Sequence, residues 1–187
     1  MKKTIVSIPF LAITVLFIQC TQQAAEPPKQ EPTYDIANMH ISVWGAAIDQ
    51  VMALVDSMPA DQLNFKPHDE SKSFAEQIEH LGSSSKSICN LYLKDAEWSK
   101  DSPPKKVEEL TKEELKEFVR SQMQAVADTL ATMSDQQLAE EITSFRKNKM
   151  TRLEGMWTVH DHMTNHKAKA NLYIRISGNT PPNYSYY

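Results

Sequence analysis

Three short segments of the chain carry the pattern of a helix N-terminus, a serine or threonine followed three residues later by glutamate. They are Ser73-Phe-Ala-Glu76, Thr111-Lys-Glu-Glu114 and Thr151-Arg-Leu-Glu154. In this pattern, the capping box, each of the two side chains accepts a hydrogen bond from a backbone N–H that the helix leaves unpaired. Apolar residues at helical spacing follow each segment. The sequence therefore predicts helices that begin at residues 73, 111 and 151.

A fourth helix is predicted before these three, from about residue 35 to residue 57. Pro59 ends it, because proline lacks the N–H that would continue the helix. One apolar stripe is expected to comprise Ile36, Val43, Ala47, Val51, Leu54 and Met58. The last helix is expected to end before Gly178, a C-cap residue, with Pro181 soon after it. The chain has only four glycines and no competing strand pattern, so we predict an all-α domain built as a four-helix bundle.

Two of the connections between the predicted helices are long. Residues 94–110 separate the second and third helices, and a connection of this length permits a crossover along the bundle. Residues 134–150 separate the third and fourth helices. This second connection contains Asp135-Gln-Gln-Leu138, which is compatible with a short helical turn. It also contains the basic run Arg146-Lys-Asn-Lys149, which we interpret as a solvated loop.

The N-terminus has the pattern of an export signal. Lys2 and Lys3 precede an apolar run of about 15 residues, which is short for a membrane span. Leu16-Phe-Ile-Gln-Cys20 resembles a bacterial lipoprotein signal, with residues 1–19 removed and Cys20 lipidated. Gln19 departs from that pattern, which has a small residue before the cysteine. An uncleaved N-terminal anchor and ordinary cleavage near Ala24-Ala25 are the alternatives, and the protein is exported in each case.

Residues 20–33 are polar and proline-bearing, as expected of a flexible tether. Residues 34–187 are long enough for one domain with a good core. The formal net charge is −4 and no basic stripe is present, so the sequence predicts no nucleic-acid partner. Its expected contact is with the membrane, through the lipid on Cys20. Cys89 would then have no partner, and the count excludes a disulfide framework.

His162 and His166 lie four residues apart on the last predicted helix, so their imidazoles are one turn apart on one face. At about 100° per residue, both fall within the apolar stripe that also carries Met163 and Tyr173. Burying two neighbouring histidines without a shared reason is costly. The spacing therefore favours a shared metal ion. Met163 and Tyr173 are candidates for lining the pocket, and core packing is the favoured alternative for Tyr173.

The remaining histidines have weaker geometric support. His80 lies on the flank of the second helix beside the small residue Ser84, which would leave room for a pocket there. Its position alone does not decide between a metal ligand and an exposed histidine without a ligand role. His40 is the reserve ligand, with packing inside the bundle as the alternative. His160 is not expected to be a ligand, and His68 is expected in a loop.

The order of these features resembles the DinB/YfiT-like family of metalloenzymes. Asn64-Phe-Lys-Pro-His68 leads into the second helix and His80, and the final block runs from His162 to Pro182. The resemblance covers about residues 35–182. It implies a four-helix bundle with a crossover between the second and third helices. It also implies that His80, His162 and His166 hold a divalent metal with one coordination position open for water or substrate.

The sequence also departs from the family pattern His-x-x-His-His-Arg-Gly-Gln. In the adjacent His-His pair of this pattern, His166 matches the second histidine, but Asn165 stands in place of the first. Lys167-Ala-Lys169 stands in place of Arg-Gly-Gln. The three ligands therefore persist while polar residues around them differ, and such residues tune a metal site. Three imidazoles suit nickel or zinc, with iron or manganese less preferred.

The resemblance implies a metal-dependent hydrolase or thiol-dependent transferase acting on a small molecule. An exported protein does not meet the cytosolic thiol pool, which weakens the transferase hypothesis. Glu79 and Asp161 adjoin ligands in sequence but project about 100° away, so neither is an obvious general base. The alternatives are an envelope lipoprotein that binds a metal or ligand without turnover, and a scaffold with unmetallated histidines. A homodimer is compatible with either.

Overall fold

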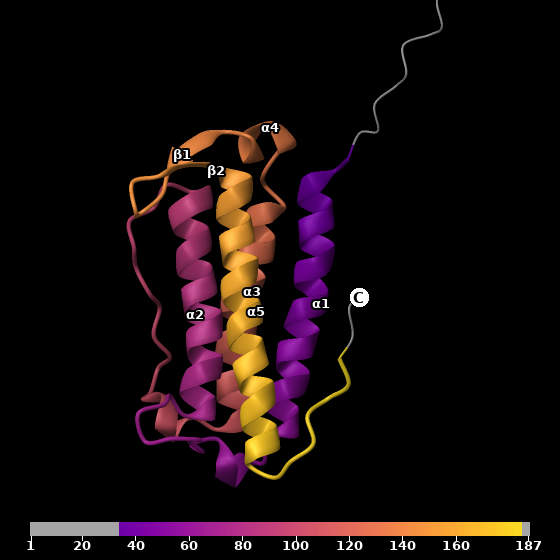
Figure 1. Cartoon of the computed structure of the whole chain (residues 1–187), viewed down its shortest axis with the longest axis vertical. Helices are drawn as coiled ribbons and strands as arrows, with labels where there is room; N and C mark the ends of the chain where they lie inside the picture. The colour runs from indigo at the N-terminus through magenta and orange to yellow at the C-terminus, as the bar shows by residue number, and fades with distance from the viewer. Residues whose placement is uncertain (1–33, 185–187) are drawn as a thin grey trace, which may run out of the picture. The chain divides into compact units, whose positions relative to one another are not determined.

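Four long helices form a bundle in the computed structural model of the chain, which describes residues 34–184 (Figure 1). They are α1 (Ile36–Ser57), α2 (Phe74–Leu93), α3 (Lys112–Leu130) and α5 (Arg152–Ile176). The shorter elements are η1 (Ala60–Gln62), η2 (Val107–Glu109), α4 (Asp135–Leu138), β1 (Glu141–Thr143) and β2 (Lys149–Thr151). The expected signal at residues 1–19, Cys20 and the tether at residues 20–33 lie outside the described residues.

The helix starts are where the capping boxes predict them. Ser73, Thr111 and Thr151 are the N-caps of α2, α3 and α5, and both hydrogen bonds of each box are formed. The short helical turn anticipated at Asp135 is α4, and it too has a capping box. α1 begins after Asp35, whose side chain accepts from the backbone of Asn38. Local hydrogen bonding therefore fixes where each helix begins.

The predicted crossover between the second and third helices is confirmed. The connection from residue 94 to residue 111 runs along the bundle, so α2 and α3 point the same way (Figure 1). Near the end of this connection, the Glu108 carbonyl accepts a hydrogen bond from the Asn64 side chain at 2.9 Å. The connection therefore ends beside the segment that precedes α2. Lys116 of α3 contacts Asp56 at the end of α1, and Arg152 of α5 contacts the Tyr92 carbonyl of α2. α1 is therefore antiparallel to α3, and α2 is antiparallel to α5.

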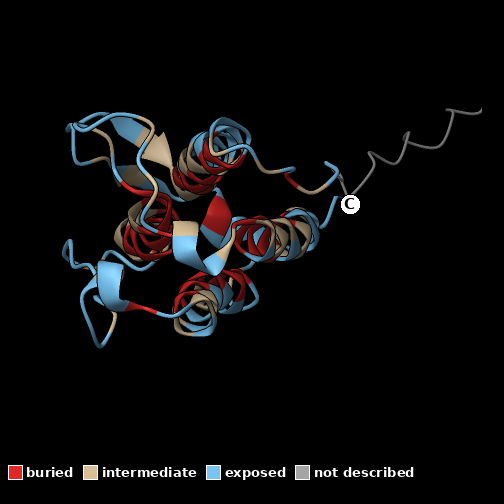
Figure 2. Ribbon diagram, turned by 90° about the horizontal axis from the view of Figure 1, so that it is seen from below, coloured by how far each residue is buried: buried red, intermediate tan, exposed pale blue. Residues whose placement is uncertain are grey.

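The buried core lies between the four long helices, whose inward faces are the buried ones in Figure 2. The stripe predicted for α1 is wrong at one position. Val43 is 37% exposed, whereas the neighbouring Trp44 is fully buried and donates its indole N–H to the Met123 carbonyl at 2.7 Å. A tryptophan can occupy the core of a bundle when its one polar group finds a partner, and the carbonyl on α3 is that partner.

A small hairpin in the second long connection departs from the predicted absence of strands. β1 and β2 are antiparallel, with Glu141 opposite Thr151, and Lys147 at the tip has a φ of 63°. Each strand has only three residues, none of them fully buried, so neither produces an apolar alternation that could be read from sequence. The basic residues from Arg146 to Lys149 are exposed, as expected.

The far end of α5 ends as predicted, with Gly178 at a φ of 85° just beyond the C-cap Ser177. Cys89 is buried and free of a disulfide. Within residues 34–184, no helix combines the length and the apolar character needed to cross a membrane.

Candidate metal centre

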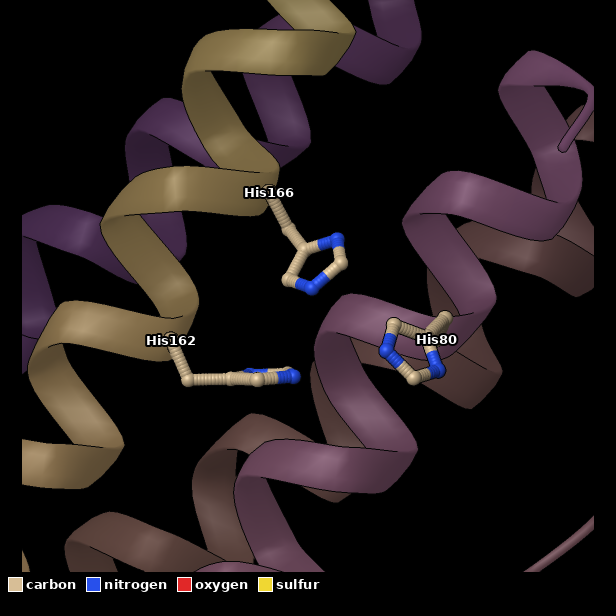
Figure 3. Close-up of side chains that lie close together, drawn as sticks. All are labelled: His80, His162 and His166. Carbon is tan, nitrogen blue, oxygen red and sulfur yellow. The ribbon is translucent and has the colours of Figure 1, made fainter. Parts of the chain in front are cut away.

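His80 of α2 and His162 and His166 of α5 meet where these two helices face each other (Figure 3). One nitrogen from each ring lies within 4.8 Å of the nitrogens offered by the other two. The ring centroids are 4.4 to 5.2 Å apart. These three side chains, here the histidine cluster, are the three that the sequence and the family resemblance single out.

Two glycines allow the helices that carry or support the cluster to pack closely. A methyl group added at Gly155 of α5 would lie 2.6 Å from the Cβ of Tyr92 on α2. One added at Gly82 of α2 would lie 3.0 Å from Val119 on α3. The contact at Gly155 leaves no room for a side chain, whereas the one at Gly82 would require Val119 to shift by a few tenths of an ångström. The close approach of α5 to α2 therefore depends on Gly155, and it brings the two histidines of α5 within reach of His80.

Two polar side chains of α2 contact the ring nitrogens of the cluster. The hydroxyl of Ser84 lies 3.1 Å from Nδ1 of His80, so Ser84 is at the cluster, where it was expected to line a pocket. The amide nitrogen of Gln77 contacts Nδ1 of His166. An oxygen that accepts the Nδ1 proton leaves Nε2 with a free lone pair for a metal, and the Ser84 hydroxyl can play this part at His80. Ser84 can therefore set the tautomer of His80, and the Gln77 contact holds the orientation of the His166 ring.

Sequence reasoning did not identify Gln77 as a site residue. The signal for it was present, because Gln77 precedes His80 by three residues and so lies on the same face of α2. What the sequence could not supply was the register of α5 against α2, and that register puts the Gln77 amide beside His166.

The third ring has a buried nitrogen that no protein group satisfies. Nδ1 of His162 has no hydrogen-bond partner among the described residues, although it is shielded from solvent. An unpaired buried polar atom costs about 1–3 kcal/mol.

The electrostatics of the cluster keep its rings neutral. Burial, followed by the positive charges of Lys100, Lys72 and Lys169, lowers the pKa of His80 to about 4. Burial also lowers the pKa of His162 to about 4, with further contributions from His80 and Lys169. The pKa of His166 falls to about 3, chiefly through burial and then through His162 and His80. Neutral imidazole is the form that binds metals.

The spacing of the nitrogens fits one ion after a small adjustment. Zinc–nitrogen bonds of about 2.1 Å put two ligands of the same ion at most about 4.2 Å apart. Nitrogens within 4.8 Å of one another therefore need only small rotations of the rings to close on it. The donor set of three imidazoles suits nickel and zinc, and less well iron and manganese.

For Met163 and Tyr173, the lining of a pocket at the cluster stays a prediction. Met163 and Tyr173 are both buried on α5, and Tyr173 is two turns beyond His166. Glu79 is buried and engaged, because it accepts from Ser83 at 2.8 Å and pairs with Lys100 at 3.1 Å. Asp161 is exposed. Among the described residues, the group that could hold a metal comprises the three histidines and no carboxylate.

His40 and His160 form a separate pair between α1 and α5. Nδ1 of His40 lies 3.0 Å from Nε2 of His160, and both residues are buried. The ring of His160 packs edge-on against Trp44, and that of His40 packs against Trp157. Burial lowers the pKa of both, in His160 to about 4. His40 therefore packs inside the bundle, which is one of the two roles considered for it. His68 lies in an exposed loop, as expected.

Comparison with known proteins identifies relatives of this fold. A family profile described as the DinB superfamily matches residues 44–169. Among solved structures, a DinB-like protein from Bacillus subtilis is 19% identical, with a TM-score of 0.63 over 79% of this chain and 98% of that one. A DinB-like protein from Bacillus cereus is 14% identical, with a TM-score of 0.66 over 79% and 97% of the two chains. No curated protein matches the chain.

Proposed function

The chain belongs to the DinB superfamily, and we propose that it is a metal-binding member exported to the cell envelope, where its histidine cluster holds one divalent ion. The observation that carries this proposal is the convergence of His80, His162 and His166, from two helices, on nitrogens within 4.8 Å of one another. Three protein ligands leave a coordination position open, as in catalytic rather than closed structural sites.

We propose metal-dependent hydrolysis or group transfer on a small molecule as the activity. A bound divalent ion supplies Lewis acidity, which polarises a substrate and activates a nucleophile. The protein contributes the three neutral imidazoles, the contacts of Ser84 and Gln77 that orient two of them, and the positive charge of Lys72, Lys100 and Lys169. These lysines would favour a substrate that carries negative charge.

Location favours the hydrolytic alternative over the thiol-dependent one. The apolar run that ends at Cys20 supports export and a lipid anchor, with residues 20–33 as the tether. A protein held in the envelope would not meet the cytosolic thiol pool, whereas water is available to it. Nickel or zinc is the proposed metal, with iron or manganese as less preferred ions.

The second proposal is a protein that binds a metal or ligand without turnover. The lack of a carboxylate in the histidine cluster supports it, as does the engagement of Glu79 by Lys100 and Ser83. General acid–base catalysis needs a titratable group within hydrogen-bond reach of the reacting atoms. Substrate turnover by the metal-loaded protein distinguishes the two proposals.

Metal analysis tests the shared part of both proposals. The protein is expressed with divalent metals supplied, purified, and measured beside a His162→Ala/His166→Ala variant and a His68→Ala control. We expect about one ion per chain in the wild type and the control, and none in the double variant. Equal metal content in all three proteins, or none in any of them, would overturn the assignment of the cluster as a metal centre.

The open position is tested by spectroscopy of the cobalt-substituted protein. We expect the visible absorption bands to shift when a small anion such as azide is added, because an exchangeable position accepts it. Bands that do not respond to azide would point to a closed, structural metal site.

The lipid anchor is tested at Cys20. Membrane fractions of cells that express the wild type and a Cys20→Ala variant are compared by immunoblotting and by incorporation of labelled palmitate. We expect label and membrane retention in the wild type alone. A Cys20→Ala variant with unchanged fractionation would favour an uncleaved N-terminal anchor.

A further inference from the structure

A second hollow in the bundle lies away from the histidine cluster. A cavity of about 750 Å³ opens between α1, α5 and the C-terminal segment at residues 180–184. In Figure 1 this segment turns back after α5 and runs alongside α1. The volume is within the range of about 300–1,000 Å³ typical of sites for small molecules.

The cavity is on a different face of α5 from the histidine cluster. On α5, His162 and His166 face α2. The α5 residues that line the cavity, on the side toward α1, are Thr164, Lys167 and Ala168. Lys167 follows His166 directly in sequence, but successive residues of a helix project about 100° apart. A ligand in the cavity would therefore not need the metal centre.

The dominant polar group of the cavity is the ammonium of Lys167. It donates to the amide oxygen of Gln50 at 2.6 Å and lies 5.0 Å from the centre of the Tyr184 ring. Lys167 is half-buried, and no carboxylate among residues 34–184 forms an ion pair with it. A half-enclosed cation held only by an amide and an aromatic ring is a good partner for an anion, since charge-assisted hydrogen bonds are the strong ones.

The charges around Lys167 favour an anion as well. Arg175 also lines the cavity and uses one guanidinium N–H on Asn171 at 3.3 Å. Asp49 is the one carboxylate among the described lining residues. The cavity therefore carries a positive excess in a chain whose formal net charge is −4, and it would concentrate anions from solution.

The rest of the lining suits an apolar body. Ala53, Leu54, Ala168, Pro181 and Pro182 contribute apolar surface, and Tyr184 adds an aromatic ring. Pockets for organic ligands combine such walls with a few placed polar groups. We propose that this cavity binds a small organic anion, with its acidic group at Lys167 and a flat apolar body between α1, α5 and the C-terminal segment.

The test uses 2-naphthoate and its neutral amide, which share a ring system and differ in charge. Calorimetric titration of the purified full chain should give saturable binding of 2-naphthoate, with the amide about tenfold weaker or undetectable. Equal binding of the two compounds would overturn the proposal of an anion site. Lack of binding of either compound at millimolar concentration would overturn the cavity as a binding site.

Three variants locate the binding. Lys167→Met removes the charge and keeps the length of the side chain, and it should weaken 2-naphthoate about tenfold. Ala168→Trp keeps the lysine and fills the cavity from an exposed helix position, so it should abolish binding without unfolding the bundle. Lys106→Met removes an exposed charge elsewhere and should leave affinity unchanged.

Binding that survives both Lys167→Met and Ala168→Trp would put the ligand elsewhere and contradict the proposal. A His162→Ala/His166→Ala protein should bind 2-naphthoate as the wild type does. Loss of binding in that variant would assign the anion to the metal centre instead. If the histidine cluster proves not to bind a metal, the proposed anion site is unaffected. If the anion site is disproved, the metal assignment is unaffected.

Discussion

At the scale of single residues, Gln77 is the side chain whose effect on the metal centre can be measured most directly. Its amide nitrogen contacts Nδ1 of His166, and groups that contact the second nitrogen of a ligating histidine hold the orientation of its ring. We expect Gln77→Leu to weaken zinc binding about 10–100-fold, measured by competition with a chromophoric chelator.

Gln77→Glu provides the matched comparison. A carboxylate can only accept a hydrogen bond, so it would keep the proton of His166 on Nδ1 and leave Nε2 free for the metal. This variant should therefore keep the affinity or increase it. Gln124→Leu on the exposed face of α3 controls for general effects. If Leu and Glu at position 77 gave the same affinity as the wild type, Gln77 would have no role in orienting His166.

The lowered pKa values of the buried histidines predict how the stability of the metal-free protein depends on pH. The pKa is about 4 for His80, His160 and His162 and about 3 for His166, against 6.5 in the unfolded chain. Between pH 6.5 and pH 4 the unfolded chain therefore binds more protons than the folded one. Stability is fully present above pH 6.5 and falls as the pH drops towards 4.

Thermal unfolding of the metal-free protein from pH 7.5 to pH 4.5 checks this sign. Tm should fall steadily below pH 6.5, and the fall should be smaller in a His162→Asn variant, which lacks one of these groups. The exposed His68→Asn variant should keep the wild-type slope. A Tm that rises on acidification would mean that these imidazoles are charged in the folded protein.

The sequence predicted the ligand residues better than their surroundings. His162 and His166 could be paired from their spacing, because one helix determines their relation. Geometry alone left His80 open, and the family resemblance supplied it. Contacts such as Gln77 with His166 and His40 with His160 join different helices. They depend on helix register, which no single segment encodes.

At the scale of elements, Gly155 sets how closely α5 packs on α2. A Cβ at this position would overlap Tyr92 at 2.6 Å, and the atom that it meets is the near end of that side chain, which cannot rotate away. We expect Gly155→Ala to destabilise the protein by about 1–3 kcal/mol, the usual cost of overpacking. Urea unfolding measures this change, and metal affinity should fall with it because the two helices carry the ligands.

Gly45 is the matched control, since it lies within α1 and nothing is within 4 Å of a Cβ added there. Gly45→Ala should stabilise the protein by about 0.4–1 kcal/mol, because alanine restricts the unfolded chain. Destabilisation of similar size by both substitutions would show that the contact with Tyr92 does not account for the effect at position 155.

Elements with strong local signals were predictable, and those without them were not. The capping boxes at Ser73, Thr111 and Thr151 predicted three helix starts because their hydrogen bonds are local. The hairpin of β1 and β2 has only three residues in each strand, and none of them is fully buried, so it leaves no apolar pattern. Val43 was predicted on the buried stripe but is exposed, and the neighbouring Trp44 is buried with its indole N–H on the Met123 carbonyl of another helix.

At the scale of the whole molecule, the crossover makes the stability of the bundle depend on the contacts between α2 and α5. α2 and α3 are parallel and joined by the long connection, while α5 is tied to α2 at one end by Arg152, which donates to the Tyr92 carbonyl and pairs with Asp95. A metal held by His80, His162 and His166 would add a second tie between α2 and α5, nearer the middle of the bundle.

A ligand that binds only the folded state stabilises it by about 2.7 kcal/mol at a free concentration 100 times its Kd. For a domain of this size that corresponds to a rise in Tm of about 5–10 °C. We therefore expect zinc to raise Tm by this amount in the wild type, measured by calorimetry at pH 7.5. Removing it with a chelator should reverse the rise.

The His162→Ala/His166→Ala variant separates this linkage from nonspecific effects of zinc. It keeps the Arg152 contacts and should unfold at the same temperature with or without zinc. Gly45→Ala should shift both the metal-free and the metal-bound Tm upward together, because it acts on α1 and not on the α2–α5 pair. A zinc-dependent rise that persists in the double variant would mean that the ion stabilises the bundle from a site other than the histidine cluster.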